Sequence, residues 1–158
     1  MSHGRPGDRA LRWPPALTAL IVIAAVCLTG CVTPATGSDS YRDKAVTSVR
    51  AATSEVATSQ LTVRLLRHHR IMQPYADETI TANETALGSI SSTFGSVQPP
   101  PEDDRVRSEI ADVLSAAEDA VAAARIAARR SDPVGLAKAA HRLRTAARGL
   151  DVAEKSLS

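Results

Sequence analysis

The residues best suited to chemistry in this 158-residue chain lie in the run 64–70, which reads RLLRHHR. Guanidinium groups bind phosphate and carboxylate oxygens, and imidazoles change charge near neutral pH. The run therefore predicts a contact with an anion, a lipid headgroup or a partner, formed by Arg64, Arg67, His68, His69 and Arg70. The alternative interpretation is a cationic helix end that complements the helix dipole and faces solvent. The sequence leaves both interpretations open.

Metal and nucleophile motifs give no further candidates. His68 and His69 are adjacent, so on a helix their side chains point about 100° apart and cannot share a face. His141 has no histidine or carboxylate three or four residues away, and no Glu-x-x-His or His-x-x-x-His spacing occurs. The chain also lacks Gly-x-Ser-x-Gly and a phosphate-binding glycine-rich loop. We therefore expect no metal site and no enzymatic activity.

The other residue suited to chemistry is Cys31, which follows a distinctive N-terminal stretch. Arg5, Arg9 and Arg12 precede an apolar run over 16–28 that only one threonine interrupts. A run of 13 residues is too short for a membrane-spanning helix, which needs about 20 apolar residues. A charged segment followed by a short apolar run is typical of a secretory signal peptide.

The apolar run ends in Leu28-Thr29-Gly30-Cys31, which resembles the lipobox of bacterial lipoproteins at all four positions. The resemblance implies cleavage between Gly30 and Cys31 and a covalent diacylglycerol on the Cys31 sulfur, with no other cofactor. It also implies a chain held on the extracytoplasmic face of the cell membrane, since two acyl chains suffice for stable anchoring. The alternatives are an ordinary secretory signal with an incidental cysteine and an uncleaved anchor. Cys27 would leave with the signal peptide, so no intrachain disulfide is expected.

Composition constrains what the rest of the chain can do. The net charge of +2 arises within residues 1–30, so residues 31–158 carry 16 basic and 16 acidic side chains. Aromatic residues make up only 3% of the chain. Nucleic-acid binding usually needs a basic face and aromatic stacking platforms, so we expect no nucleic-acid partner. Alanine, valine and leucine must supply most of the core, which favours long helices that approach closely.

Hydrophobic spacing predicts four helices after the signal peptide of residues 1–30 and a flexible tether over 31–39. Their expected ranges are 40–72, 75–97, 102–130 and 133–157, within a domain of residues 40–158. Gln73-Pro74 is expected to end the first helix, and Asp132-Pro133 to cap the fourth. Ser59 interrupts the apolar stripe of the first helix, and Leu61 widens it. Asn83 occupies a seam position of the second, where a polar residue can fix helix register.

Charge predicts that the last two helices pair in antiparallel orientation. Residues 102–119 contain seven acidic and two basic side chains, whereas residues 125–148 contain seven basic and one acidic. Folding back near Asp132 is expected to bring Glu118 and Asp119 beside Arg144 and Arg148, and Asp112 near Lys155. The sequence thus predicts an all-α, up-and-down four-helix bundle.

These features predict a non-enzymatic lipoprotein of the cell envelope that acts through protein contacts. The alternative is a bundle that binds or senses a small ligand between its helices, with Asn83 and Tyr75 or His141 as the first residues to inspect. An enzyme without a recognisable motif ranks third. The sequence leaves the oligomeric state open.

Overall fold

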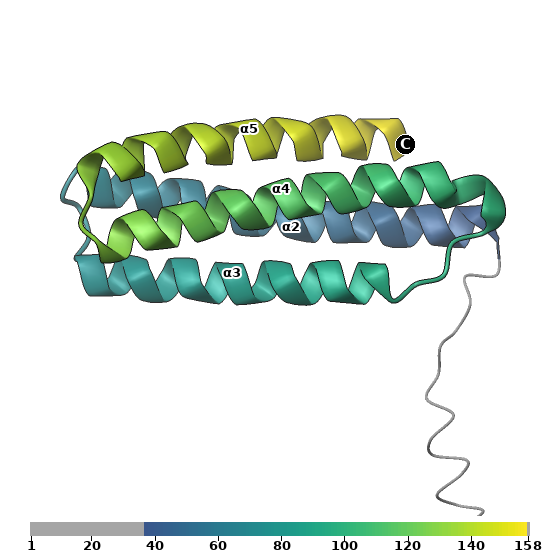
Figure 1. Ribbon diagram of the computed structural model, residues 1–158, viewed down its shortest axis with the longest axis horizontal. Coiled ribbons are helices and arrows are strands. Elements are labelled where there is room, and N and C mark those ends of the chain that lie inside the picture. Colours follow the sequence, from purple (N-terminus) through teal and green to yellow (C-terminus); the bar gives the residue numbers. More distant parts are fainter. Residues whose placement is uncertain (1–36, 158) are drawn as a thin grey trace, which may run out of the picture. The chain divides into compact units, whose positions relative to one another are not determined.

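Four long α-helices and one short 3-10 helix make up residues 37–157, the part of the chain that the computed structural model describes. The predicted signal peptide, Cys31 and most of the predicted tether lie outside the described residues. Neighbouring helices run in alternating directions (Figure 1), so the all-α, up-and-down bundle is confirmed. The elements are α2 (Ser38–Arg67), α3 (Gln73–Gly95), η1 (Pro101–Asp103), α4 (Asp104–Arg129) and α5 (Pro133–Leu157). None of these helices is both long and apolar enough to cross a membrane.

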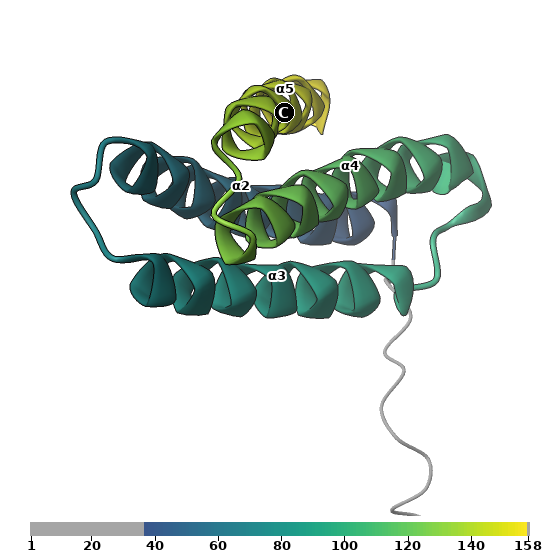
Figure 2. The ribbon, with the colours of Figure 1, turned by 60° about the vertical axis from the view of Figure 1, so that its left-hand side comes forward.

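The four helices are not placed at equal distances around the bundle axis. Each helix packs against its neighbours in sequence, and α5 closes the bundle by packing against α2. The two pairs of helices that lie opposite each other across the bundle differ. α2 also contacts α4, whereas α3 and α5 make no contact within the described residues. Figure 2 shows this arrangement, with α3 and α5 on opposite sides and α2 and α4 between them.

Alanine makes the close approach of α2 and α4 possible. The inner face of α4 carries buried alanines throughout its second half, at Ala117, Ala120, Ala124, Ala127 and Ala128. Since an alanine side chain occupies little space, the backbones on either side can approach until their remaining side chains interlock. The larger fully buried side chains fill the space around this strip: Tyr41, Ile80, Leu87, Ile110, Leu114, Leu143 and Leu150.

The first helix ends earlier than its sequence predicts. α2 stops at Arg67 rather than at Met72, because His69 adopts a left-handed backbone with φ of 53°. The amide of Arg70 then donates to the Leu65 carbonyl at 2.9 Å. This bond is the signature of a Schellman motif, which closes a helix by satisfying its last carbonyls. Part of the basic run therefore forms a turn and not the last turn of a helix.

Pro74 begins a helix instead of ending one. α3 starts at Gln73, two residues before the predicted start at Tyr75, with Pro74 in its first turn. Proline is favoured there because its missing amide N–H would have no helical partner and its φ is already helical. The helix then continues without a break through Gly88 to Gly95.

Two other helix starts also differ slightly from the prediction. α2 begins at Ser38 and not at residue 40, so Ser38 and Asp39 are helical and do not belong to the tether. The third helix is predicted to start at residue 102, but a single 3-10 turn over Pro101–Asp103 comes first and the α-helical part begins at Asp104. Short 3-10 turns are common where α-helices begin.

The turn between α4 and α5 agrees closely with the prediction. Ser131 has a φ of 48° and ends α4 in the left-handed conformation. Asp132 then accepts a hydrogen bond from the Val134 amide at 3.0 Å, and α5 begins at Pro133. Gly135 leaves room for this cap, because a Cβ there would lie 2.5 Å from the Asp132 Oδ2 atom.

The predicted apolar stripe of α2 is buried except near its interruption and at its end, where Leu66 is partly buried. Val56 and Val63 are fully buried, but Leu61 is 47% exposed, so its predicted place in the core is wrong. Next to Leu61, the buried positions of α2 are occupied by the polar residues Ser59 and Thr62.

Ser59 and Asn83, the two polar residues within the predicted seams, are hydrogen-bonded to each other. The Asn83 Nδ2 atom donates to the Ser59 Oγ atom at 2.9 Å, and both side chains are buried. Burying either group without a partner would cost free energy, so the pair fixes the register of α3 against α2.

Removing one member of this pair should cost more stability than replacing both. We expect Ser59→Ala to lower the free energy of unfolding by about 1–3 kcal/mol, because it leaves the Asn83 amide buried without its acceptor. Ser59→Ala combined with Asn83→Leu should be nearly neutral. Urea unfolding followed by far-UV circular dichroism measures both changes. A double variant that loses at least as much as the single variant would contradict this account of the pair.

Tyr41 closes the core at the end of the bundle where α2 begins. Its ring packs on Phe94 with centroids 5.7 Å apart, and its side chain is fully buried. The hydroxyl has no hydrogen-bond partner within the described residues. Burial, together with the nearby carboxylates of Asp103 and Asp104, raises the pKa of Tyr41, although Arg107 acts in the opposite direction.

The raised pKa of Tyr41 predicts a loss of stability at alkaline pH. The folded state favours the neutral phenol, so its contribution is complete below the ordinary pKa of 10.0 and declines as the pH rises further. Tyr41→Phe should therefore reduce the fall in unfolding free energy above that pH. Tyr75→Phe is the matched control, since Tyr75 is 62% exposed. Equal alkaline curves for the two variants in urea unfolding would refute the prediction.

Candidate anion-binding groove

A polar groove runs between α2 and α5 and contains part of the predicted basic cluster. It has a volume of about 290 Å³. We call it the basic groove and define it by its lining residues, which are Gln60, Arg64, Arg67, His68, Ala140 and Arg144. Three arginines and a histidine thus surround one hollow, and none of its lining residues is acidic.

Helix geometry explains why these residues meet. Arg64, Arg67 and His68 follow the 3–4 spacing that places side chains on one face of a helix. Arg144 approaches from α5, one turn beyond Ala140. Ala140 has too small a side chain to fill the hollow between the helices. At its base, the Gln60 Nε2 atom donates to the Leu143 carbonyl at 3.1 Å, which ties α2 to α5.

The arginines of the basic groove have no acidic partner. Within the described residues, no carboxylate oxygen lies within 4.0 Å of a side-chain nitrogen of Arg64, Arg67 or Arg144. All three side chains are exposed to solvent. The groove therefore keeps its full positive charge and its free guanidinium donors.

Two acidic side chains at this end of the bundle, Glu84 and Asp77, form ion pairs between α3 and α4. Arg125 binds Glu84 through two nitrogens, one at 3.2 Å, and Arg129 binds Asp77 at 2.9 Å. Hydrogen bonding to Glu84 raises the pKa of the Arg125 guanidinium above its ordinary value. Asp132 caps α5. Neutralisation on the α3–α4 side leaves the α2–α5 side of this end positively charged.

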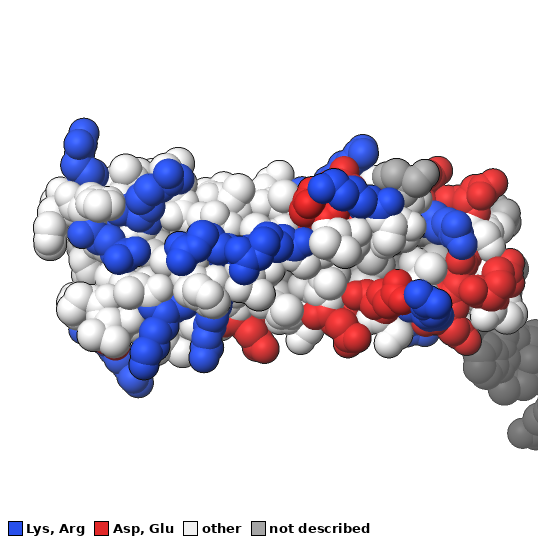
Figure 3. Space-filling model, turned by 90° about the horizontal axis from the view of Figure 1, so that it is seen from above, with Lys and Arg blue, Asp and Glu red and all other residues white. Residues whose placement is uncertain are grey.

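The surface shows the same separation of charge over a longer distance. Figure 3 views the bundle from the side of α5. Basic side chains gather on the half nearer the α2–α3 and α4–α5 turns, and acidic ones on the half nearer the start of α2. The acidic block of residues 102–119 and the basic block of residues 125–148 therefore lie toward opposite ends of the same surface.

The remaining members of the predicted basic cluster lie outside the basic groove. His69 lines a separate hollow at the end of the bundle, which it shares with Arg67, Ile71 and Leu136. Arg70 follows in the turn after α2, is exposed and does not line the groove. Folding thus divides the run 64–70, because the helix ends at Arg67 and the chain turns at His69.

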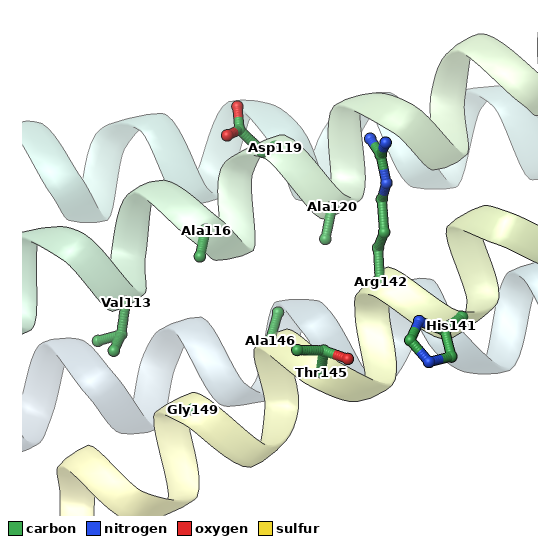
Figure 4. A pocket seen from close by; sticks show the side chains of 9 residues that line it. All are labelled: Val113, Ala116, Asp119, Ala120, His141, Arg142, Thr145, Ala146 and Gly149. Atoms are coloured by element: carbon green, nitrogen blue, oxygen red, sulfur yellow. The ribbon is translucent and has the colours of Figure 1, made fainter.

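A second, mostly apolar groove lies between α4 and α5, with a volume of about 510 Å³ (Figure 4). Val113, Ala116 and Ala120 line it from α4, and Ala146 and Gly149 line it from α5. Small residues on both helices leave this hollow open at the surface, and its polar lining residues are Asp119, His141, Arg142 and Thr145.

The predicted ion pairs between the last two helices do not form. The helices are adjacent and antiparallel as expected, but no ion pair joins Glu118 or Asp119 to Arg144 or Arg148. Figure 4 shows Asp119 pointing away from α5, with alanines occupying the contact between the helices.

Lys155 also differs from its predicted pairing, since it binds Asp151 one turn away at 2.7 Å and not Asp112. Within the described residues, the ion pairs that join helices connect α3 with α4, α2 with α5 through Arg50 and Glu154 at 2.6 Å, and α2 with η1 through Arg42 and Asp103 at 3.3 Å.

The three residues suggested for a small-ligand site do not converge. Asn83 is buried against Ser59, Tyr75 is exposed at the start of α3, and His141 lies on the α4–α5 groove. Across residues 37–157, no three histidine, cysteine, aspartate or glutamate side chains come together in a group that could hold a metal ion.

Sequence reasoning missed two groove residues, Gln60 and Arg144. Gln60 lies one turn before Arg64, so its position on the same face of the helix could have been found from spacing alone. Arg144 lies in the basic block of the last helix, but its level relative to Arg64 depends on how α5 packs against α2.

Comparison of the chain with protein-family models, with curated proteins and with solved structures finds no match. The residues and their geometry therefore carry the functional argument.

Replacing an arginine by glutamine should change the free energy of unfolding differently for a paired arginine and for one without an ion-pair partner. Arg125→Gln should lower the free energy of unfolding by about 1 kcal/mol, because it breaks a bidentate pair between α4 and α3. Arg144→Gln should leave the free energy unchanged or raise it slightly, because it removes repulsion among like charges. Urea unfolding in low salt tests both. An equal loss in the two variants would show that Arg144 has a stabilising partner.

Proposed function

We propose that this chain is a lipid-anchored lipoprotein of the bacterial cell envelope whose bundle acts by binding and not by catalysis. The observation that carries the proposal is the sequence Leu28-Thr29-Gly30-Cys31 after a basic segment and a short apolar run. Diacylglycerol on the Cys31 sulfur holds the chain on the extracytoplasmic face of the cell membrane. The bundle then acts through protein contacts within the envelope.

Only a short stretch of chain separates Cys31 from the bundle. Gly37, the first described residue, lies six positions after Cys31, a stretch that can span at most about 20 Å. A lipid on Cys31 would therefore keep the start of α2 close to the membrane.

The surface chemistry of the bundle favours binding over catalysis. The polar side chains of the basic groove are arginine, histidine and glutamine, which can hold an anion or an acidic partner surface. The α4–α5 groove adds a mostly apolar hollow between exposed helices, which can accept a side chain from a partner.

Replacing the lipobox cysteine tests the anchor directly. We expect the wild-type chain, expressed in a bacterial host, to fractionate with membranes at the mass of residues 31–158 plus diacylglycerol. Cys31→Ser should lose both the lipid and the cleavage that depends on it. Intact-mass spectrometry of the membrane and released fractions measures both effects.

Cys27→Ser provides the matched control, because it changes the other cysteine of the chain and leaves the lipobox intact. It should process and fractionate like the wild type. If Cys31→Ser matches the wild type in mass and location, the anchor is refuted.

A further inference from the structure

We propose that the basic groove between α2 and α5 is a binding site for a phosphate group, held by Arg64, Arg67 and Arg144 with His68 beside them. The site is formed entirely within residues 37–157, so the proposal goes beyond the lipid anchor and does not depend on it.

The positive charge of the three arginines favours the binding of an anion of high charge. Three arginines line one hollow whose lining contains no carboxylate, and none of them has an ion-pair partner within the described residues. Like charges placed together repel each other, so the arrangement is less stable without a counter-ion than with one. A bound anion removes this repulsion and gains charge-assisted hydrogen bonds.

The number of donors favours phosphate over carboxylate. A carboxylate offers two oxygens and one negative charge, which a single arginine can satisfy through two parallel hydrogen bonds. A phosphate monoester offers three oxygens and a charge of about −1.5 to −2 near pH 7. Three arginines from two helices match the phosphate monoester better than the carboxylate. The groove volume of about 290 Å³ also leaves room for the group that carries the phosphate.

The dipole of α2 opposes an anion here but is the weaker effect. The groove contains the last turn of α2, the negative end of the helix dipole, which is equivalent to a partial charge of about −0.5. Arg64, Arg67 and Arg144 together contribute three full positive charges at the same place. The sign of the local field is therefore positive.

A soluble or polymeric phosphate compound and a lipid headgroup share this chemistry. The phosphate site itself does not rest on the proposed function.

Pyrophosphate binding to the full chain tests the site. The protein is purified in a non-ionic detergent and titrated with sodium pyrophosphate by calorimetry, with sodium chloride holding the ionic strength constant. We expect saturable binding to the wild type and a rise in melting temperature. Arg67→Gln and Arg144→Gln should each weaken binding by about tenfold or more, because each removes a charge-assisted contact.

Arg70→Gln and Arg130→Gln are the matched controls, since both residues are exposed, lie near the same end and have no ion pair within the described residues. They remove the same charge from outside the groove and should weaken binding by less than about twofold at moderate salt. Far-UV circular dichroism verifies that every variant is folded.

Three outcomes would overturn the proposal. They are no saturable binding to the wild type, an equal loss in groove and control variants, and binding of a glutamate-rich peptide as tight as that of pyrophosphate. Micelles that contain phosphatidylglycerol test the source of the phosphate. Competition of this lipid with pyrophosphate in the wild type and not in Arg67→Gln assigns the phosphate to a lipid headgroup, and absence of competition in the wild type assigns it to a soluble or polymeric compound.

Discussion

The alanine strip along α4 is the constraint on which the rest of the bundle depends. Short side chains there let α2 contact α4 across the bundle, which pushes α3 and α5 to opposite sides. A core of this kind gains little free energy from each residue, so it needs long helices that stay in contact over many turns. The fixed spacing of the helices then determines which surface side chains can meet.

Polar contacts fix the register of the helices. The alanine strip does this poorly, because its small side chains are alike at successive turns. Ser59 and Asn83 fix α3 against α2 inside the core, and Gln60 joins α2 to the backbone of α5. The Arg125 and Arg129 pairs join α4 to α3 at the surface. These pairs engage Glu84 and Asp77, and the arginines of the basic groove have no ion-pair partner within residues 37–157. The basic groove thus follows from the way the bundle is held together.

The local sequence and the tertiary contacts disagree most at the helix ends. The sequence extends the first helix to Met72, because the apolar spacing continues to Leu66 and the next expected end signal is Gln73-Pro74. In the structure, His69 turns the chain so that Ile71 lies at the end of the bundle beside Leu136. Packing across that end favours a turn that the helical pattern does not reveal.

The sequence by itself determined the number of helices, their order and most of their buried faces, because periodicity of apolar residues and the cap at Asp132 are local properties. It also revealed the basic run that contains Arg64, Arg67 and His68. Only the tertiary structure decided that Arg144 joins them and that Arg70 does not. That outcome depends on the register of α5 against α2, which side chains far apart in the sequence establish when the helices pack.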